Sequence, residues 1–451
     1  HSRFGSTQAV PSVCAQLPMK SPMRFFAAGS LLAVGGALKL PSQLPLPIAH
    51  EKEGDVFKQT LHNFENVQYY GDFKIGGQDI RGIFDTGSFE LLVRSTRCSA
   101  CAHPTPAYDH SLSTSYEKNG TLTKHVFGSG PCISMKGYEE IDVGPLKSHG
   151  QSFWEIVEHK IQVLDTANFA AIVGIGPNFA YGNQDKTLLM NFGVKEFSIC
   201  LQRTPGSDGF MTWGSEVTAD YKEKNYARAN VIGKHHWVTR MHNVSFGKSP
   251  LNDNYANVPC TGGGCAAIID SGTSLIAAPG LALQQLSTQI EPIMEDCSNM
   301  HLLPTLHFVI DGTELTLPPE AYVMRVTGEI VEADSIWDIL WFKPKVRKVN
   351  MCMPAFMQMD MHSQHGPVWI LGMPFFRYYH TTFDREQKAM HFALAGPSCS
   401  AHPFKSNASD KALIAFNAGA SKGPMDIDVH QIVPPTLSSM IDDSTDNNVD
   451  L

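Results

Sequence analysis

Residues 83–88 read IFDTGS, and residues 268–274 read IIDSGTS. In both stretches an Asp, a hydroxyl residue and a Gly follow directly after two apolar residues. Roughly ninety residues after the first stretch, residues 172–174 read IVG, and roughly a hundred after the second, residues 370–372 read ILG. Because the two texts recur in the same order, the sequence predicts an internal repeat in which each half is one copy of the same β lobe.

The composition agrees with a β protein of two lobes. The chain has 451 residues, including 37 Gly and 28 Pro, and no long stretch shows the apolar period of a helix. Many short strands joined by tight turns are therefore predicted, and the length is too great for one small core. The formal net charge is -9, with Lys and Arg scattered singly, which argues against a nucleic-acid partner.

The start of the chain is typical of a secretory signal. Lys20 and Arg24 precede an apolar run over residues 25–38. Small residues lie in the second half of this run, where a signal-peptidase cleavage site requires them. A buried or membrane-spanning helix is the alternative, but the run is shorter than the roughly 20 residues that a bilayer span requires. We expect no stable membrane anchor. The predicted segments are a leader with the signal (1–42), a short propeptide-like or linker segment (43–66), an N-terminal β lobe (67–205), a C-terminal β lobe (206–395) and a disordered acidic tail (396–451).

Cysteines and glycosylation patterns also point to the secretory pathway. The chain has 10 Cys, and disulfides persist in oxidising compartments. Cys14 precedes the predicted signal, so an odd number remains after it and at least one thiol should be unpaired. Asn119, Asn243 and Asn407 stand in glycosylation acceptor patterns. We therefore expect an extracellular protein or one in an acidic compartment like a lysosome or vacuole.

The two Asp-containing turns carry the predicted chemistry. Gly87 and Gly272 allow a tight turn and let a second backbone approach where a Cβ would collide. The hydroxyls of Ser88 and Thr273 are placed to donate to the carboxylates. Thr86 and Ser271 are placed to bond across to the opposite loop.

If the two loops face each other, Asp85 and Asp270 lie close together in a partly dry cleft. Ionising both carboxyl groups would then cost free energy through charge repulsion, so one pKa rises and the other falls. A pair that holds one proton can accept a proton from a bound water and donate one to a scissile carbonyl. Either triplet alone is typical of a β-turn, and it is the repetition that favours a catalytic pair.

On these residues the sequence resembles the pepsin-like aspartic proteases, the family of pepsin, cathepsin D and the plasmepsins. The resemblance runs from about Tyr69 to Ala395 and includes FSICL at residues 197–201 and WILG at residues 369–372. It implies a mostly β, two-lobed fold with a deep cleft between the lobes and a β-hairpin flap over it. It also implies an aspartic endopeptidase that acts on polypeptides without a metal or another cofactor, and we expect a monomer.

The predicted flap departs from the family pattern. Phe127 stands where the family usually has Tyr, and Leu92 stands where a Trp commonly follows the first loop. Both would give the cleft an apolar wall, which predicts hydrophobic side chains around the cleaved bond. The substrate-binding residues predicted from the resemblance are Leu92, Phe127, Gly128, Ser129 and Ser274. Because the flap is altered, a catalytically weak or inactive peptide-binding protein on the same fold remains the alternative.

The resemblance implies three disulfides, namely Cys260 with Cys265, Cys297 with Cys352, and Cys98 with Cys101. Since only two residues separate the last pair, a link from either cysteine to Cys132 is an alternative. Cys200 and Cys399 receive no partner, and Cys200 is interpreted as a buried apolar thiol. His235 and His236 are interpreted as incidental surface histidines.

Overall fold

The computed structural model describes residues 52–53, 56–102, 104–127, 130–179, 186–214, 226–247, 259–260, 262–332, 345–404, 423–428, 431–435 and 448–449. Residues 51–451 form one compact unit. The predicted leader lies outside the described residues.

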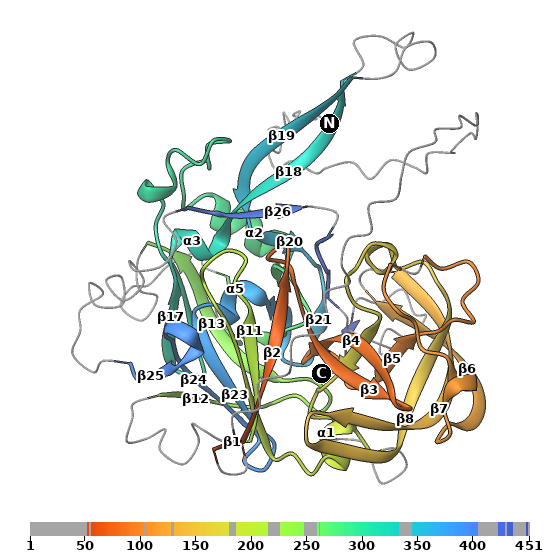
Figure 1. Cartoon of the computed structure of the whole chain (residues 1–451). Coiled ribbons are helices and arrows are strands. Elements are labelled where there is room, and N and C mark those ends of the chain that lie inside the picture. Colours follow the sequence, from red (N-terminus) through yellow and green to blue (C-terminus); the bar gives the residue numbers. More distant parts are fainter. Residues whose placement is uncertain are drawn as a thin grey trace, which may run out of the picture. The chain divides into compact units, whose positions relative to one another are not determined.

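The described residues form three sheets of fifteen, nine and three strands (Figure 1). The largest contains β1 (Lys52–Glu53), β2 (Val56–Phe64), β3 (Gln68–Ile75), β4 (Gln78–Asp85), β5 (Leu91–Arg94), β6 (Glu117–Phe127), β7 (Gly130–Val143), β8 (Leu146–His159), β9 (Ala171–Gly174), β10 (Glu196–Leu201), β11 (Gly209–Trp213), β12 (Ala227–Asn230), β23 (Tyr379–Asp384), β24 (Ala389–Ala395) and β25 (Ala401–His402).

The second sheet contains β13 (Val238–Phe246), β14 (Cys265–Ile269), β15 (Ile276–Ala278), β16 (Leu306–Ile310), β17 (Thr313–Leu317), β20 (Phe356–Gln358), β21 (His362–Ser363), β22 (Gly366–Leu371) and β27 (Asn448–Val449). The third contains β18 (Val323–Glu332), β19 (Lys345–Pro354) and β26 (Met425–Asp428). The α-helices among the described residues are short: α1 (Leu188–Asn191), α2 (Gly280–Ser287), α3 (Pro319–Tyr322) and α5 (Met373–Phe376). The prediction of a mostly β fold is confirmed.

The internal repeat of the sequence corresponds to a repeated arrangement of three strands. In the first half, β4 runs parallel to β9 with Ile83 opposite Ile172, and β5 runs antiparallel to β9. In the second half, β14 runs parallel to β22 with Ile268 opposite Ile370, and β15 runs antiparallel to β22. Each Asp-containing turn therefore leaves the end of a strand that is paired with the Ile-Val-Gly or Ile-Leu-Gly strand of its own half.

The large sheet takes strands from both halves of the chain. β10 pairs with β23, which places Phe197 opposite Phe383, and β11 pairs with β2. Because β2 begins at Val56, the folded body starts earlier than the predicted boundary at Val67, and much of the segment predicted as a linker is a strand of this sheet. The lobe boundaries at 205 and 395 stay predictions.

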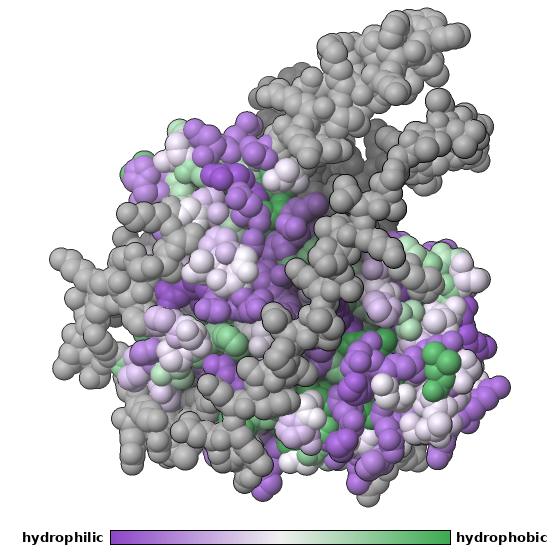
Figure 2. Space-filling view, viewed as in Figure 1, coloured by the Kyte–Doolittle hydropathy of each residue, from purple (hydrophilic) through white to green (hydrophobic). Residues whose placement is uncertain are grey.

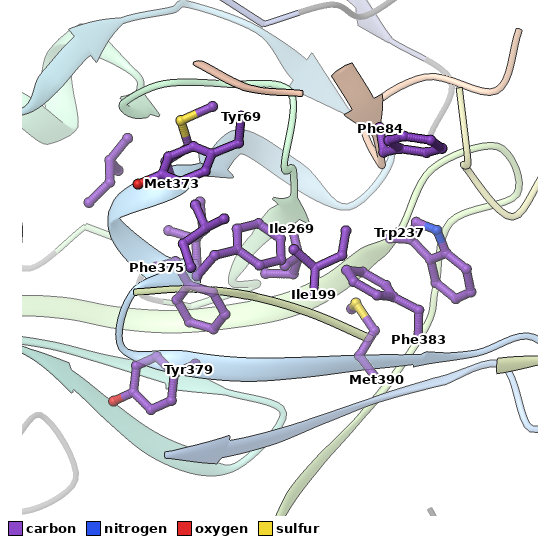
Figure 3. Packing of buried hydrophobic residues seen from close by; sticks show 14 of the residues in the cluster. Tyr69, Phe84, Ile199, Trp237, Ile269, Met373, Phe375, Tyr379, Phe383 and Met390 are labelled. Carbon is purple, nitrogen blue, oxygen red and sulfur yellow. The ribbon is translucent and has the colours of Figure 1, made fainter. Parts of the chain in front are cut away.

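The strands that precede the two Asp residues are packed on both faces. Phe84 and Ile269 belong to the largest apolar cluster, in which Trp237 and Phe383 also lie (Figure 3). Ile83 packs in a different cluster on the opposite face, as the period of two in a strand requires. Close packing on both faces leaves the backbone little freedom to shift where it enters the Asp-containing turns.

Figure 2 shows a face on which hydrophilic side chains predominate and apolar side chains form small areas. Among the described helices, none combines the length and the apolar character needed to cross a bilayer.

Four disulfides occur in the described part of the chain. Three join the pairs suggested by the family resemblance, namely Cys98–Cys101, Cys260–Cys265 and Cys297–Cys352. The fourth joins Cys200 to Cys399, two cysteines to which the sequence analysis gave no partner. The interpretation of Cys200 as a buried apolar thiol is therefore wrong. Cys132 is a buried free thiol, so the alternative link to it is not formed.

The prediction that residues 396–451 are disordered is wrong for several segments. Cys399 is buried and bonded to Cys200 in β10, and β25 pairs with β24. β26 adds to the third sheet alongside β18. The reason is that the apolar residues of these segments find partners on the folded body, which the polar composition of the tail does not reveal.

Candidate active site

The structure brings the two Asp-containing turns together. The side chains of Asp85 and Asp270 are completely buried. A Cβ added at Gly87 would lie 2.6 Å from Cγ of Asp270, and a Cβ added at Gly272 would lie 2.3 Å from Oδ1 of Asp85. Each carboxyl group therefore rests against the glycine of the opposite turn, at a distance that no other residue type allows.

Both carboxyl groups are held in the same way. One oxygen accepts a hydrogen bond from the amide two residues later, and the other accepts from the hydroxyl three residues later. The four donors are Gly87 N (2.8 Å) and Ser88 Oγ (2.6 Å) to Asp85, and Gly272 N (2.7 Å) and Thr273 Oγ1 (2.5 Å) to Asp270. All four are neutral groups, so they orient the carboxyls without supplying a full positive charge.

Thr86 and Ser271 join the two turns to each other. Oγ1 of Thr86 donates to the carbonyl of Ile269 at 2.7 Å and accepts from the amide of Ser271 at 2.9 Å. In the reciprocal direction, Oγ of Ser271 donates to the carbonyl of Phe84 at 2.5 Å and accepts from the amide of Thr86 at 3.2 Å. This buried exchange fixes the separation of the two turns, because each hydroxyl bridges two backbone groups of the opposite strand end.

The proximity of the two carboxyl groups affects the pKa of Asp270. Burial, and secondly the negative charge of Asp85, raise the pKa of Asp270 well above its ordinary value. Asp270 therefore keeps its proton at a pH where an exposed Asp has lost it. A protonated and an ionised carboxyl side by side can act as acid and base at one position.

The residues predicted to contact substrate are only partly described. Leu92 and Phe127 are buried in one apolar cluster. Phe127 ends β6 opposite Gly130 of β7, so the predicted flap is a hairpin, and its tip residues Gly128 and Ser129 lie outside the described residues. Ser274 lies just beyond the second turn, and its hydroxyl donates to the carbonyl of Val67 at 2.5 Å.

One residue that contacts the first turn was missed by the sequence analysis. His236 is completely buried, and its Nδ1 lies 2.8 Å from the carbonyl oxygen of Gly87, so Nδ1 must carry the hydrogen. Burial lowers the pKa of His236 to about 4, which keeps the ring neutral. His235 is buried as well, so the interpretation of both as surface residues is wrong. No local pattern distinguishes such a histidine from an exposed one.

The remaining predicted sites are placed as follows. Asn119 is exposed on β6, whereas Asn243 is half-buried and Ser245 of its acceptor pattern is buried. Asn407 lies outside the described residues. Glycosylation stays a prediction at all three positions.

A group of possible metal ligands in the described part of the chain is formed by Cys98, Cys101 and His159, whose donor atoms lie within 4.8 Å of one another. The two cysteines are joined in a disulfide and therefore supply no thiolate.

Comparison with known proteins places this geometry in a family. The eukaryotic aspartyl protease profile matches residues 68–395. Cathepsin D of Chionodraco hamatus is 31% identical over 82% of this chain and 90% of its own length. Cathepsin D of Rattus norvegicus is 30% identical over 75% of this chain and 83% of its own, and renin-2 of Mus musculus is 30% identical over 74% and 82%. The chain belongs to the eukaryotic aspartyl protease family.

Proposed function

We propose that this protein is an aspartic endopeptidase that hydrolyses polypeptides with a water molecule activated by Asp85 and Asp270. The observation that carries the proposal is the pair of buried carboxyl groups, each packed against the glycine of the opposite turn. The matched hydrogen bonds from amides and hydroxyls support it, because they hold both groups rigidly without neutralising them.

The chemistry follows from one shared proton. The ionised carboxylate accepts a proton from the water, whose oxygen attacks the carbonyl carbon of the peptide. The protonated carboxyl donates to the carbonyl oxygen, and a noncovalent tetrahedral intermediate forms. When the C–N bond breaks, the carboxyl that took the proton from water gives it to the leaving nitrogen. The hydroxyl of the intermediate that was the carbonyl oxygen returns its proton to the other carboxylate as the carbonyl reforms, so the pair again holds one proton. The raised pKa of Asp270 supports the acid role for this residue.

The proposed substrates are polypeptides with hydrophobic residues around the cleaved bond. The apolar side chains of Leu92 and Phe127, which share one cluster, support this preference. Ser274 and the flap residues Gly128 and Ser129 are proposed to contact the substrate backbone. The disulfides support passage through the secretory pathway, and we propose that the enzyme acts there or outside the cell, as a monomer.

A peptide-binding protein that does not cut is the second candidate. Leu92 and Phe127 favour it, because both replace residues that the family uses in and behind the flap. A peptide would still be held in the groove, but the flap would position it less firmly over the carboxyl pair.

Turnover of a denatured protein substrate at acid pH, compared between wild type and Asp270→Ala, tests the proposal. We expect turnover to fall by at least about 10²–10⁴-fold, the contribution typical of a positioned acid or base. Asp79→Ala is the matched control, because Asp79 is an exposed residue of β4, the strand that leads to Asp85. Equal turnover in wild type and Asp270→Ala would exclude the enzyme and leave the binding protein.

A further inference from the structure

A segment from the C-terminal part of the chain lies directly beside the second catalytic turn. The amide of Val433 donates to Oγ of Ser274 at 2.8 Å, and the amide of Ser274 donates to the carbonyl of Val433 at 2.9 Å. Ser274 follows Asp270 by four positions in the sequence. Both backbone groups of Val433 are therefore satisfied by one residue at the edge of the site, which is how an extended peptide is held without regard to its side chains.

The side chain of Val433 is buried in the apolar cluster to which the residues proposed for substrate binding belong. It is 2% exposed and packs in the cluster that contains Phe127 of the flap hairpin and Leu92 behind it. A substrate side chain that used this surface would have to displace Val433. The two contacts, one through the backbone and one through the side chain, are independent of each other.

The chain leading to Val433 is anchored on the folded body. Met425 and Ile427 of β26 are buried in a cluster with Leu275, the residue after Ser274. Nε2 of Gln68 then donates to the carbonyl of Gln431 at 3.0 Å. Successive contacts therefore direct the chain toward the second catalytic turn.

The segment has the form of an extended peptide that is poorly suited to cleavage. Val433 and Pro435 are buried, whereas Ile432 and Pro434 are half-buried, which is the alternation of an extended strand. Neither Pro434 nor Pro435 has an amide hydrogen, and both have a fixed φ. A peptide held by main-chain hydrogen bonds loses two consecutive donors there, so binding at Val433 need not align a bond for hydrolysis.

We infer that residues 431–435 are a built-in peptide ligand of the candidate active site, and that they inhibit the enzyme by occupying its substrate groove. This inference rests on the proposed function. The match to the protease family ends at residue 395, so the segment is an addition to the part that the family shares. Because the ligand is tethered, its effective concentration is on the order of millimolar, and a weak contact is enough to keep the groove filled.

The test compares wild type with Val433→Asp in the full chain. An ionised side chain cannot enter the apolar cluster, so the segment should leave the groove. We expect turnover of a dilute peptide substrate to rise about tenfold, the ratio for a millimolar effective concentration and a contact of about 0.1 mM. A labelled peptide with the sequence of residues 429–437 should bind the variant and be excluded by wild type.

Two controls isolate the effect of the groove. Val433→Ile keeps an apolar branched side chain and should behave as wild type. Leu302→Asp adds the same charge at a side chain that is 72% exposed, and should also leave turnover and peptide binding unchanged. If Val433→Asp fails to fold, a specific protease site inserted between Phe404 and Gly423 replaces it, and turnover of the cut protein should rise on dilution.

The outcomes separate this inference from the proposed function. If Val433→Asp binds the peptide and wild type does not, but neither protein cuts any substrate, the inference stands as an occupied peptide groove and the enzyme proposal fails. If wild type turns over substrate as fast as the variant and neither binds the peptide, the enzyme proposal stands and the inference is overturned. A loss of thermal stability with unchanged turnover and peptide binding would likewise overturn it, because the segment would then serve only to stabilise the fold.

Discussion

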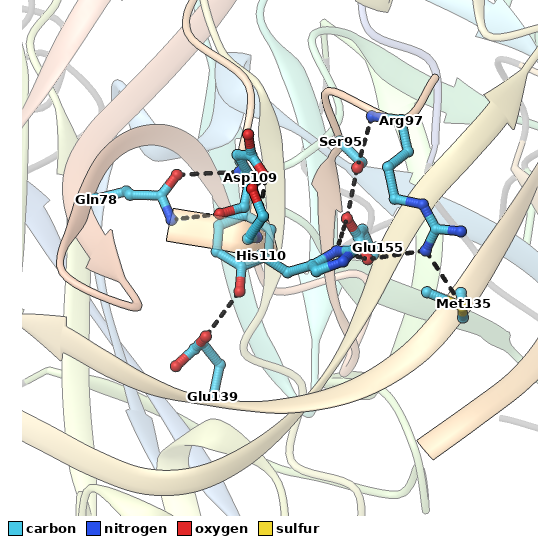
Figure 4. A network of polar contacts seen from close by, with 10 residues as sticks. Gln78, Ser95, Arg97, Asp109, His110, Met135, Glu139 and Glu155 are labelled. Carbon is cyan, nitrogen blue, oxygen red and sulfur yellow. Dashed lines mark hydrogen bonds and ion pairs between the residues drawn. The ribbon is translucent and has the colours of Figure 1, made fainter. Parts of the chain in front are cut away.

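Two regions of this protein that contain buried carboxyl groups differ in their surroundings. The proposed catalytic pair, Asp85 and Asp270, is held by backbone amides and hydroxyls. Glu155 of β8 is equally buried, but it accepts from Oγ of Ser95 at 2.5 Å and from Nδ1 of His110 at 3.0 Å, and it lies 3.9 Å from the guanidinium of Arg97 (Figure 4). We call Glu155, Ser95, His110 and Arg97 the Glu155 network.

The difference shows that burial alone does not mark a catalytic carboxyl group. In the Glu155 network a carboxylate is buried among basic side chains, which offset the cost of removing its charge from water. Around Asp270 the nearest charged group is another carboxylate, so burial and repulsion act in the same direction and raise the pKa of Asp270. The Glu155 network is an arrangement that stabilises a fold, whereas the surroundings of Asp270 favour its protonated form.

The largest expected effect comes from separating Asp85 and Asp270, the proposed catalytic pair. In Gly272→Ala the new Cβ would meet Oδ1 of Asp85 at 2.3 Å, so one turn must move. We expect turnover to fall by about 10²-fold or more, because a shift of about 1 Å in reacting groups has effects of that size. Gly263→Ala is the control, since a Cβ there meets nothing within 4 Å. Equal activity of the two variants would show that the tight contact between the turns is not needed.

A smaller effect, of a different kind, is expected in the Glu155 network. Glu155→Ala removes the shared acceptor of Ser95 and His110, and should lower the free energy of unfolding by about 1–3 kcal/mol. Turnover per folded molecule should stay the same. Denaturant unfolding and active-site titration measure the two quantities separately. Glu140→Ala is the control, because the pair of Glu140 with His149 is exposed and should contribute little. A loss of turnover without a loss of stability would place Glu155 in the catalytic machinery instead.

The geometry of the two Asp-containing turns could be predicted from sequence because their determinants are local and repeated. The residue types of each turn, from the Asp to the hydroxyl residue three positions later, decide the hydrogen bonds within the turn. Because the turn occurs twice in the sequence, the second turn could be predicted to face the first. Strand pairing of Ile83 with Ile172 and of Ile268 with Ile370 follows from the same repetition.

The contacts that sequence reasoning missed are between distant residues without a local pattern. Cys200 and Cys399 are 199 residues apart, and Val433 reaches Ser274 across 159 positions. The contact of His236 with Gly87 depends on the tertiary structure and has no signal in the sequence around either residue. The composition of a polar tail predicts disorder, because a few apolar residues that dock on the folded body hardly change the mean hydropathy of the segment.

The pH dependence of stability gives the most specific comparison of the two regions. Since the folded-state pKa of Asp270 is raised, the stabilisation from its proton is complete below the unfolded pKa of about 3.9 and is lost as pH rises through the folded value. Asp270→Asn has no proton to lose. Its free energy of unfolding relative to wild type should therefore increase with pH, by about 1.4 kcal/mol for each pKa unit between the folded and unfolded values.

Denaturant unfolding at a series of pH values measures this difference directly. A flat difference between wild type and Asp270→Asn, or one that decreases with pH, would contradict the raised pKa. Turnover by wild type provides a second reading of the same proton, because the acid form of Asp270 is needed to protonate the scissile carbonyl. Turnover should therefore persist through the pH interval in which the variant gains relative stability, and should decline where that gain levels off, at the folded pKa of Asp270. If turnover instead declines well before the gain levels off, or persists well beyond it, the proton that stabilises the fold is not the one that the reaction uses.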